Sequence, residues 1–329
     1  MILDGDIGGT KCNLALFRTD GGTLRPVFQR RFESNKYAEF EKVIQDFLGQ
    51  AEPSLRAGQG QITAAGFGVA GAVVHQRVRA TNLPWVVDAA GLGQEFQIPH
   101  VALLNDLEAT GYGLEVLRPD ELCTLNPGIP APQANRALIA AGTGLGEAIL
   151  FWDGGRHIVA ATEGGHCDFA ARNDTEIELL RFLKKRHEFA DCELILSGRG
   201  FRTLHEFLNP SVKHSSFETP GADPAPEITK MGLASTCKVC VKTLDLFAEV
   251  YGAEAGNLAL KCLARGGVYV AGGIAVKILE KLKDGSFVRA FCAKANFGIL
   301  LSQIPIYVVL NTDVPLLGAA ARAAALGGT

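Results

Sequence analysis

The sequence has no apolar run of the roughly 18 residues that a membrane helix needs. Its longest candidate, the closing stretch VPLLGAAARAAAL, is interrupted by Arg322. The first ten residues, MILDGDIGGT, have no basic start and contain two aspartates, which is not typical of a secretory signal. We therefore expect a cytoplasmic protein with no membrane partner.

An excess of basic residues is also missing. The 329 residues include 32 Lys and Arg against 35 Asp and Glu, which gives a net charge of −3. A chain with this balance has no general cationic surface for phosphate backbones, so we expect no nucleic-acid partner. The length predicts about two domains and is sufficient for a large buried core.

The cysteines do not form the dense pattern of a disulfide scaffold, because eight of them are scattered over the whole chain. One CxxC pair, Cys237 and Cys240, lies in a segment with a helical pattern. A structural zinc site needs four ligands at recognisable spacing, and the sequence shows two here. The alternative is that both cysteines are small apolar residues on a helix.

Glycine, in contrast, is abundant: 38 of 329 residues, about 12% against a usual 7%. Most glycine clusters follow a short apolar run, where glycine permits a positive φ or a close approach of the backbone to a ligand. This arrangement predicts an α/β enzyme that holds a polyanion. The clusters are GDIGGTK, GFGVAGAV, GTGLGEA, TEGGHCD, SGRGF and VAGGIA.

A strand–turn–strand–turn unit occurs twice. The first copy has strands at 2–6 and 12–18 and a turn at Asp20-Gly21-Gly22; the second occupies residues 137–155 and ends with Asp153-Gly154-Gly155. Gly8 lies twelve residues before Asp20, and Gly142 lies eleven before Asp153. Glycine hairpins are common, but two copies with matched order and spacing favour a duplicated α/β fold.

The remaining pattern predicts alternating helices and strands in two α/β domains. We expect a small domain at 1–110, a large domain at 111–311, and a final helix at about 312–329 that packs back on the small domain. The stretch 232–264 predicts one or two long helices, and the Pro- and Ser-rich stretch 209–230 predicts a surface loop. The expected helix caps are Asp174 for the helix that follows it, and Asn311 or Thr312 for the last helix, with Pro315 in its first turn.

Neither glycine turn is a Walker loop or a dinucleotide fingerprint, because the spacing of GDIGGTK and GTGLGEA fits neither pattern. Hairpin turns rich in free N–H groups form anion-binding concavities instead. Thr10, Lys11 and Thr143 add hydroxyl and ammonium donors. Asp6, at the end of its strand, is a candidate to hold Mg²⁺ through water, since this ion takes one or two carboxylates and keeps several waters.

Seven motifs follow one another along the chain: DIGGTK, TNLPW (81–85), LLNDLEA (103–109), AAGTGLGEA (140–148), TEGGHCDFA (162–170), ELILSGRG (193–200) and VAGGIA (270–275). In these motifs and their order the chain resembles the bacterial glucokinases, in the sugar-kinase group with the actin-like ATPase fold. The resemblance extends from residue 4 to the last helix. It implies an α/β, two-domain actin-like ATPase (ribonuclease H-like) fold, duplicated, with an interdomain cleft and with ATP phosphates held by both hairpins.

The same resemblance implies the roles of single residues. Local pattern alone leaves open that Asp106 caps a helix, that His166 is structural and that Glu163 is a solvated charge. Asp168 is expected to be structural, Asn82 and Trp85 to lie near the site or in the core, and Glu147 to face away from the second phosphate loop. The implied site consists of Asp106 as catalytic base; Asn105, Glu163, His166 and Glu193 for the sugar; Gly8, Gly9, Thr10, Lys11, Gly142, Thr143 and Gly144 for the ATP phosphates; Gly272 and Gly273 for adenosine; and Asp6 for Mg²⁺.

We therefore predict a glucokinase that converts glucose to glucose 6-phosphate with ATP and Mg²⁺, as a homodimer. One alternative is a ROK-group kinase for another hexose or an amino sugar, although the cysteine-rich zinc motif of that group is missing. Another is a non-catalytic sugar-sensing relative. Such repressors carry a DNA-binding segment before the first hairpin, whereas here the first strand is expected to start at Ile2.

Overall fold

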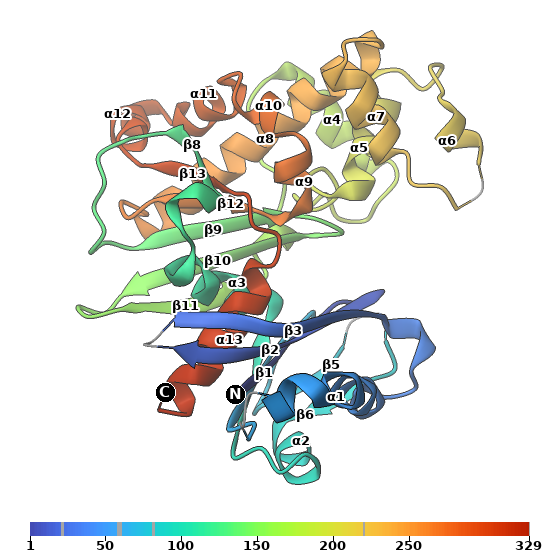
Figure 1. The fold of residues 1–329 in the computed structure, drawn as a ribbon. Helices are drawn as coiled ribbons and strands as arrows, with labels where there is room; N and C mark the ends of the chain where they lie inside the picture. The colour runs from blue at the N-terminus through green and yellow to red at the C-terminus, as the bar shows by residue number, and fades with distance from the viewer. Residues whose placement is uncertain (21–22, 58–60, 81–82, 220, 329) are drawn as a thin grey trace. The chain divides into compact units, whose positions relative to one another are not determined.

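The computed structural model describes residues 1–329 except 21–22, 58–60, 81–82, 220 and 329. The chain divides into two compact units: Met1–Arg118 together with Asp313–Thr329, and Pro119–Thr312 (Figure 1). The sequence suggested a division near residue 111, but a helix runs to Gly113 and a short helical turn follows it. No helix in the described part of the chain is long and apolar enough to cross a membrane.

The first unit is built on a five-stranded sheet with the order β3-β2-β1-β4-β7. Strands β1, β2 and β3 are antiparallel neighbours, and β4 and β7 continue the sheet parallel to β1. The turn expected after Asp20 falls on residues 21–22, outside the described residues, as does Asn82. The elements are β1 (Ile2–Ile7), β2 (Lys11–Asp20), β3 (Thr23–Glu33), α1 (Phe40–Ala57), β4 (Ala64–Val69), β5 (Arg77–Arg79), β6 (Val86–Asp88), α2 (Ala89–Glu95), β7 (His100–Asn105), α3 (Asp106–Gly113) and α13 (Val314–Leu326).

Apolar spacing explains how this sheet is covered. Helix α1 buries Phe40, Val43, Ile44 and Phe47, which recur at the helical period, in the same core as Trp85. The Trp85 indole N–H donates to the Tyr37 carbonyl at 3.1 Å, so Trp85 is a core residue. Alanine-rich α13 packs on α3, β1 and β4. The core and neighbours of α1 therefore follow directly from its sequence period.

The second unit repeats the strand pattern of the first. Its six-stranded sheet has the order β11-β10-β9-β12-β13-β8, in which β9 takes the place of β1: the antiparallel pairs β9–β10 and β10–β11 lie on one side of it, and the parallel pairs β9–β12 and β12–β13 on the other. Strand β8 is an addition that pairs antiparallel with β13 at the edge. The predicted duplication is confirmed. The strands are β8 (Leu122–Asn126), β9 (Arg136–Ala141), β10 (Leu145–Trp152), β11 (His157–Thr162), β12 (Val268–Ala271) and β13 (Ile306–Val309).

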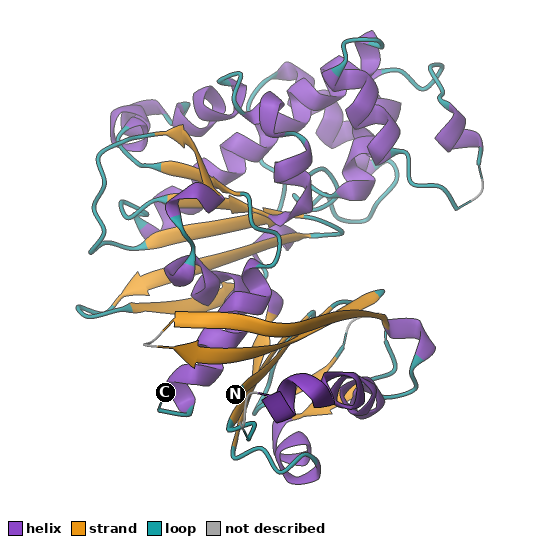
Figure 2. Ribbon diagram, viewed as in Figure 1, coloured by secondary structure: helices purple, strands orange, loops and turns teal. Residues whose placement is uncertain are grey.

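Most helices of the second unit gather on one side of its sheet (Figure 2). The long central one, α8, is a single 25-residue helix, where the sequence allowed one or two. Gly252 and Gly256 let it approach the backbone of α11, because a Cβ at either position would clash with Phe287 or Phe291. The helices are α4 (Asp174–Lys184), α5 (Gly198–Leu208), α6 (Ser215–Glu218), α7 (Ala225–Leu233), α8 (Lys238–Cys262), α9 (Gly272–Lys277), α10 (Leu279–Leu282), α11 (Ser286–Cys292) and α12 (Gly298–Ser302).

Three local predictions were wrong. Asn173, not Asp174, caps α4, since its side chain accepts the Glu176 N–H at 3.0 Å and Asp174 is already helical. The N-cap of α13 is Asp313, one residue after the expected Thr312, and it makes no side-chain capping bond. Stretch 209–230 is not only loop, because it contains α6 and the start of α7.

Candidate active site

The first phosphate hairpin joins β1 to β2 in the first unit. The Gly8 N–H donates to the Lys11 carbonyl at 3.0 Å, which closes the turn around Gly9. Ser34 holds the turn from the end of β3: its hydroxyl donates to the Gly8 carbonyl at 2.9 Å, and its N–H donates to the Thr10 carbonyl at 3.1 Å. Thr10 and Lys11 are exposed, so their hydroxyl and ammonium groups are accessible to an anion.

Carboxylates gather where the parallel strands of the first sheet end. Asp6 lies near the end of β1, and Asp106 opens α3 directly after β7. Burial raises the pKa of Asp6 to about 6, with further contributions from the charges of Asp106 and Asp313, while Arg31 acts in the opposite direction. Neighbouring carboxylates at the carboxyl edge of an α/β sheet suit Mg²⁺, because a cation offsets both the burial of the Asp6 charge and its repulsion by the other carboxylates. The donor set around Asp6 therefore fits this ion.

Asn105, and not Asp106, is the N-cap of α3. Its Oδ1 accepts the Leu107 N–H at 2.9 Å, and its Nδ2 donates to the Gly71 carbonyl at 3.2 Å. One oxygen of Asp106 also accepts the Leu107 N–H, at 2.9 Å. Because Asn105 supplies the cap, capping alone does not account for an aspartate at position 106.

In the second unit, a short turn after β11 carries two of the expected sugar-binding residues, Glu163 and His166. The Nε2 atom of His166 lies 4.0 Å from Glu193 Oε2, and its Nδ1 lies 3.1 Å from Asp191 Oδ2. The bond to Asp191 raises the pKa of His166, and the charges of Glu193 and Glu163 add to the effect. The structure thus brings Glu163, His166 and Glu193 together.

Glu193 is fixed by the backbone around it. Its Oε2 accepts the Leu145 N–H at 3.1 Å, Arg199 pairs with its other oxygen, and its own N–H donates to the Gly165 carbonyl at 3.0 Å. Gly144 is needed beside it, since a Cβ there would clash with the Glu193 carboxylate. The β9–β10 hairpin and the predicted sugar-binding residues therefore share one local framework.

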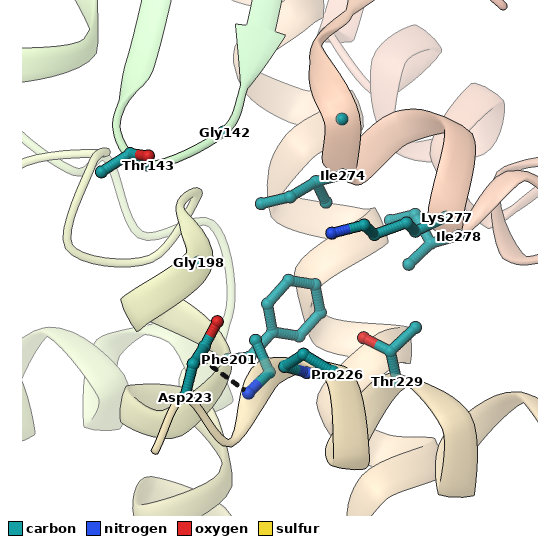
Figure 3. A pocket seen from close by; sticks show the side chains of 12 residues that line it. Gly142, Thr143, Gly198, Phe201, Asp223, Pro226, Thr229, Ile274, Lys277 and Ile278 are labelled. Atoms are coloured by element: carbon teal, nitrogen blue, oxygen red, sulfur yellow. Dashed lines mark hydrogen bonds between the residues drawn. The ribbon is translucent and has the colours of Figure 1, made fainter. Parts of the chain in front are cut away.

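The second hairpin also forms a wall of a pocket of about 240 Å³ (Figure 3). Gly142 and Thr143 lie on one side and Gly273 on another, so the structure joins the predicted phosphate and adenosine segments. Gly272 has φ +86°, and a Cβ there would clash with the Ala141 carbonyl, so this close turn requires glycine. The other lining residues are Gly198, Phe201, Asp223, Ala225, Pro226, Thr229, Ile274, Lys277 and Ile278.

Several of these residues had no recognisable pattern in the sequence. Asp191 orients His166 from a segment without periodicity, and Asp223 comes from the stretch that we expected to be a surface loop. Lys277 lies a helical turn beyond the predicted glycine pair, and its ammonium group points toward the pocket in Figure 3. Arg199 lies within the SGRG motif and Phe201 directly follows it, so this motif is the sequence feature that pointed to these two residues.

Glu147 does not line the pocket. Its side chain is buried beneath the Gly164–His166 turn, where a Cβ on Gly164 would clash with its carboxylate. Burial raises the pKa of Glu147 to about 7, and the Glu254 carboxylate on α8 adds to the effect. This residue therefore affects stability at the base of the site.

Comparison with known proteins identifies the family of the chain. The sequence model of the family described as "Glucokinase" matches residues 3–326. This chain belongs to the glucokinase family. It is 38% identical over 345 residues to the glucokinase of Nostoc punctiforme, with 99% of each chain covered.

The glucokinase family fold is also shared. A crystal structure of glucokinase from an Antarctic psychrotroph matches 100% of this chain and 99% of that chain, with 28% identity and a TM-score of 0.85. A ROK family glucokinase from Streptomyces griseus, solved with glucose and AMPPNP, matches 98% of each chain with 19% identity and a TM-score of 0.66. The predicted actin-like ATPase fold is confirmed.

Proposed function

We propose that this chain transfers the γ-phosphoryl group of ATP to the 6-hydroxyl of glucose, with Asp106 as the catalytic base. The observation that carries this proposal is that Asp106 lies close enough to Asp6, at the strand ends of the first unit, for its charge to raise the pKa of Asp6. The chain that carries these two carboxylates belongs to the glucokinase family. Phosphoryl transfer has a loose transition state, so the base mainly orients the hydroxyl and takes its proton late.

Each unit offers one hairpin to the nucleotide, and the second unit adds its pocket. Gly8, Gly9, Thr10 and Lys11 offer donors in one unit, and Gly142, Thr143 and Gly144 offer them in the other. The adenosine group lies against Gly272 and Gly273, beside the apolar side chains of the pocket. Asp6 holds Mg²⁺ through water, and the ion supplies positive charge to the phosphate oxygens.

Glucose is bound through its hydroxyl groups. Asn105 keeps one N–H for a hydroxyl after its bonds to Leu107 and Gly71. Glu163 and Glu193 accept hydroxyl protons. Asp191 accepts a hydrogen bond from the Nδ1–H group of His166, which leaves Nε2 to contact the sugar. A sugar lacking one of these hydroxyls leaves a polar group unpaired, so selectivity follows from the same contacts.

Cytoplasmic location and a homodimer complete the proposal. Light scattering coupled to size-exclusion chromatography measures the second: a mass of twice 35.0 kDa is expected, and a monomer at micromolar concentration would contradict it.

A coupled assay over sugars and phosphoryl donors tests the activity. We expect the highest kcat/KM with glucose and MgATP, and loss of turnover in Asp106→Asn. Turnover with an N-acetylated amino sugar but not with glucose would favour the amino-sugar kinase instead. Glucose binding without turnover of any sugar would favour a sugar-sensing relative.

A further inference from the structure

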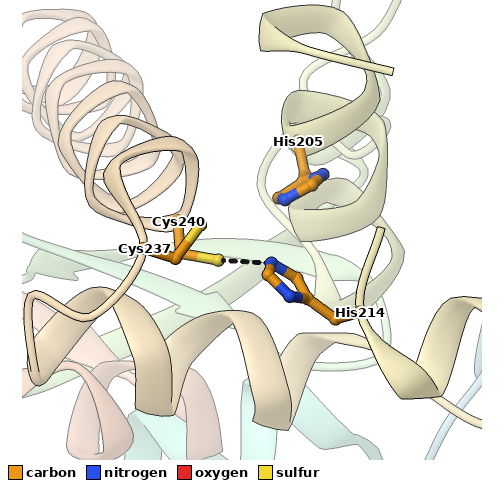
Figure 4. Close-up of side chains that lie close together, drawn as sticks. All are labelled: His205, His214, Cys237 and Cys240. Atoms are coloured by element: carbon orange, nitrogen blue, oxygen red, sulfur yellow. Dashed lines mark hydrogen bonds between the residues drawn. The ribbon is translucent and has the colours of Figure 1, made fainter. Parts of the chain in front are cut away.

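Two histidines and two cysteines meet in the second unit, apart from the proposed active-site residues. His205 lies on α5, His214 immediately precedes α6, and Cys237 and Cys240 lie at the start of α8 (Figure 4). One ligand atom from each residue lies within 4.8 Å of all the others. We refer to these four residues as the His–Cys cluster. Two of its members are the CxxC pair for which the sequence showed no further ligands.

We propose that the His–Cys cluster binds one Zn²⁺ ion as a closed, structural site. Two thiolates and two imidazoles form a complete tetrahedral donor set of the kind that structural zinc sites use. Bond lengths of about 2.3 Å to sulfur and 2.0–2.1 Å to nitrogen place tetrahedral ligand atoms about 3.3–3.8 Å apart. The observed spread therefore requires only small side-chain movements to admit the ion.

His205 provides independent support. Its side chain is fully buried, with 0% exposure, and neither ring nitrogen has a hydrogen-bond partner among the residues that the structure describes. Burying an imidazole without a partner is costly. Its ring lies against that of His214, with centroids 5.2 Å apart, and His214 Nε2 lies 3.1 Å from Cys240 Sγ. A bound metal satisfies the nitrogen that otherwise has no partner.

The backbone holds both cysteine sulfurs in position before a metal binds. Cys237 is the N-cap of α8 and Cys240 lies in its first turn, so the two side chains share one face of the helix. The free N–H groups at the start of the long helix α8 favour the thiolate form of Cys237, its N-cap. The site thus joins the start of α8 to α5 and to the stretch that leads into α6.

Metal analysis of untagged protein, purified without chelator, tests the proposal. We expect about one zinc per chain in the wild type and less than about a tenth in Cys237→Ser and His214→Asn, since each removes one of four ligands. Both positions are partly exposed, which limits damage to the core. Cys292→Ser and His187→Asn are matched controls outside the cluster and should keep their zinc. Unchanged zinc in the two cluster variants, or none in the wild type, would overturn the site.

A second measurement needs no variant. Wild-type protein, stripped of metal and given Co²⁺, should show the intense visible bands of tetrahedral cobalt and a thiolate-to-cobalt band in the near ultraviolet. A weak octahedral spectrum, or a Cys237–Cys240 disulfide in the protein as purified, would overturn the proposal.

Discussion

Carboxylates in this chain differ mainly in what surrounds them. Asp4 and Asp6 lie two residues apart on β1, yet Asp4 is fully buried and its oxygens have no hydrogen-bond partner within the described chain. Burial raises the pKa of Asp4 well above its usual range, which favours the neutral form of its carboxyl group. Asp6 instead lies near the β1–β2 hairpin, where the charge of Asp106 acts on it. The location of a carboxylate, more than its pKa shift, separates a functional group from a structural one.

Asp106→Asn should lower kcat by at least about a hundredfold, because a general base contributes at least this factor. The ATP KM should change little, since the nucleotide contacts remain. Initial rates over glucose and ATP concentrations measure both. Glu108→Gln, two residues further along α3, is the matched control and should keep turnover. A wild-type kcat in Asp106→Asn would make Asp106 a helix residue without catalytic function.

Glu163→Gln and Glu193→Gln should each raise the glucose KM by about tenfold or more. A hydrogen bond to a charged group contributes about 1.5–3 kcal/mol, and 1.4 kcal/mol is a factor of ten. The ATP KM should stay constant, because the nucleotide is bound by other residues. Asp168→Asn, in the same loop and expected to be structural, is the control. Equal shifts of both KM values in the Glu variants would argue for misfolding and against sugar binding.

Among helices and strands, the sequence predicted those features that are determined by residues close together in the chain. Both glycine hairpins and α1 were predictable, because turn residues and apolar period act locally. Helix starts were displaced by one residue at Asn173 and Asp313, since adjacent polar residues compete for the cap. Asp223 and His205 had no local pattern at all. Their roles arise from segments that meet only after folding.

The buried Glu147 on β10, which is affected by the charge of Glu254 on α8, gives the protein a testable pH dependence. Glu147 is ionised in the unfolded chain above about pH 4.5, but burial raises its pKa in the folded protein to about 7. The free energy of unfolding therefore falls as the pH rises between these values, by roughly 3 kcal/mol at about 1.4 kcal/mol per pKa unit. Below this range both states hold the proton and the penalty disappears.

Glu147→Gln should consequently raise the melting temperature at pH 8 and change it little at pH 5. Scanning calorimetry at both pH values measures the difference between variant and wild type. Glu163→Gln, an exposed carboxylate nearby, is the control and should show no such pH dependence. A Glu147→Gln variant that is no more stable than wild type at pH 8 would place the penalty on another group, such as Glu254.

At the scale of the molecule, the two units share one strand order but carry different chemical groups. The first unit supplies the carboxylates and one of the proposed phosphate hairpins, and the second supplies the proposed sugar-binding residues, the other hairpin and the pocket. Within the second unit, α5 connects two features: Phe201 lines the pocket, and His205, one helical turn later, belongs to the His–Cys cluster. The stretch after His214 leads to Asp223 and Ala225, which also line the pocket. Metal binding and nucleotide binding should therefore be coupled.

Removal of zinc should raise the ATP KM about three- to tenfold and leave the glucose KM, measured at saturating ATP, nearly unchanged. Without the metal, the His–Cys cluster no longer holds α5 against α8, so part of the free energy of nucleotide binding is spent on ordering this side of the pocket. A tenfold weaker affinity corresponds to about 1.4 kcal/mol. This expectation rests on the proposed nucleotide pocket as well as on the metal site. Chelator-treated wild type and Cys237→Ser should give the same ATP KM, and zinc should restore it only in the wild type. Cys292→Ser under the same treatment should follow the wild type. An ATP KM that is indifferent to zinc, in protein that binds the ion, would limit the metal to stabilising the fold.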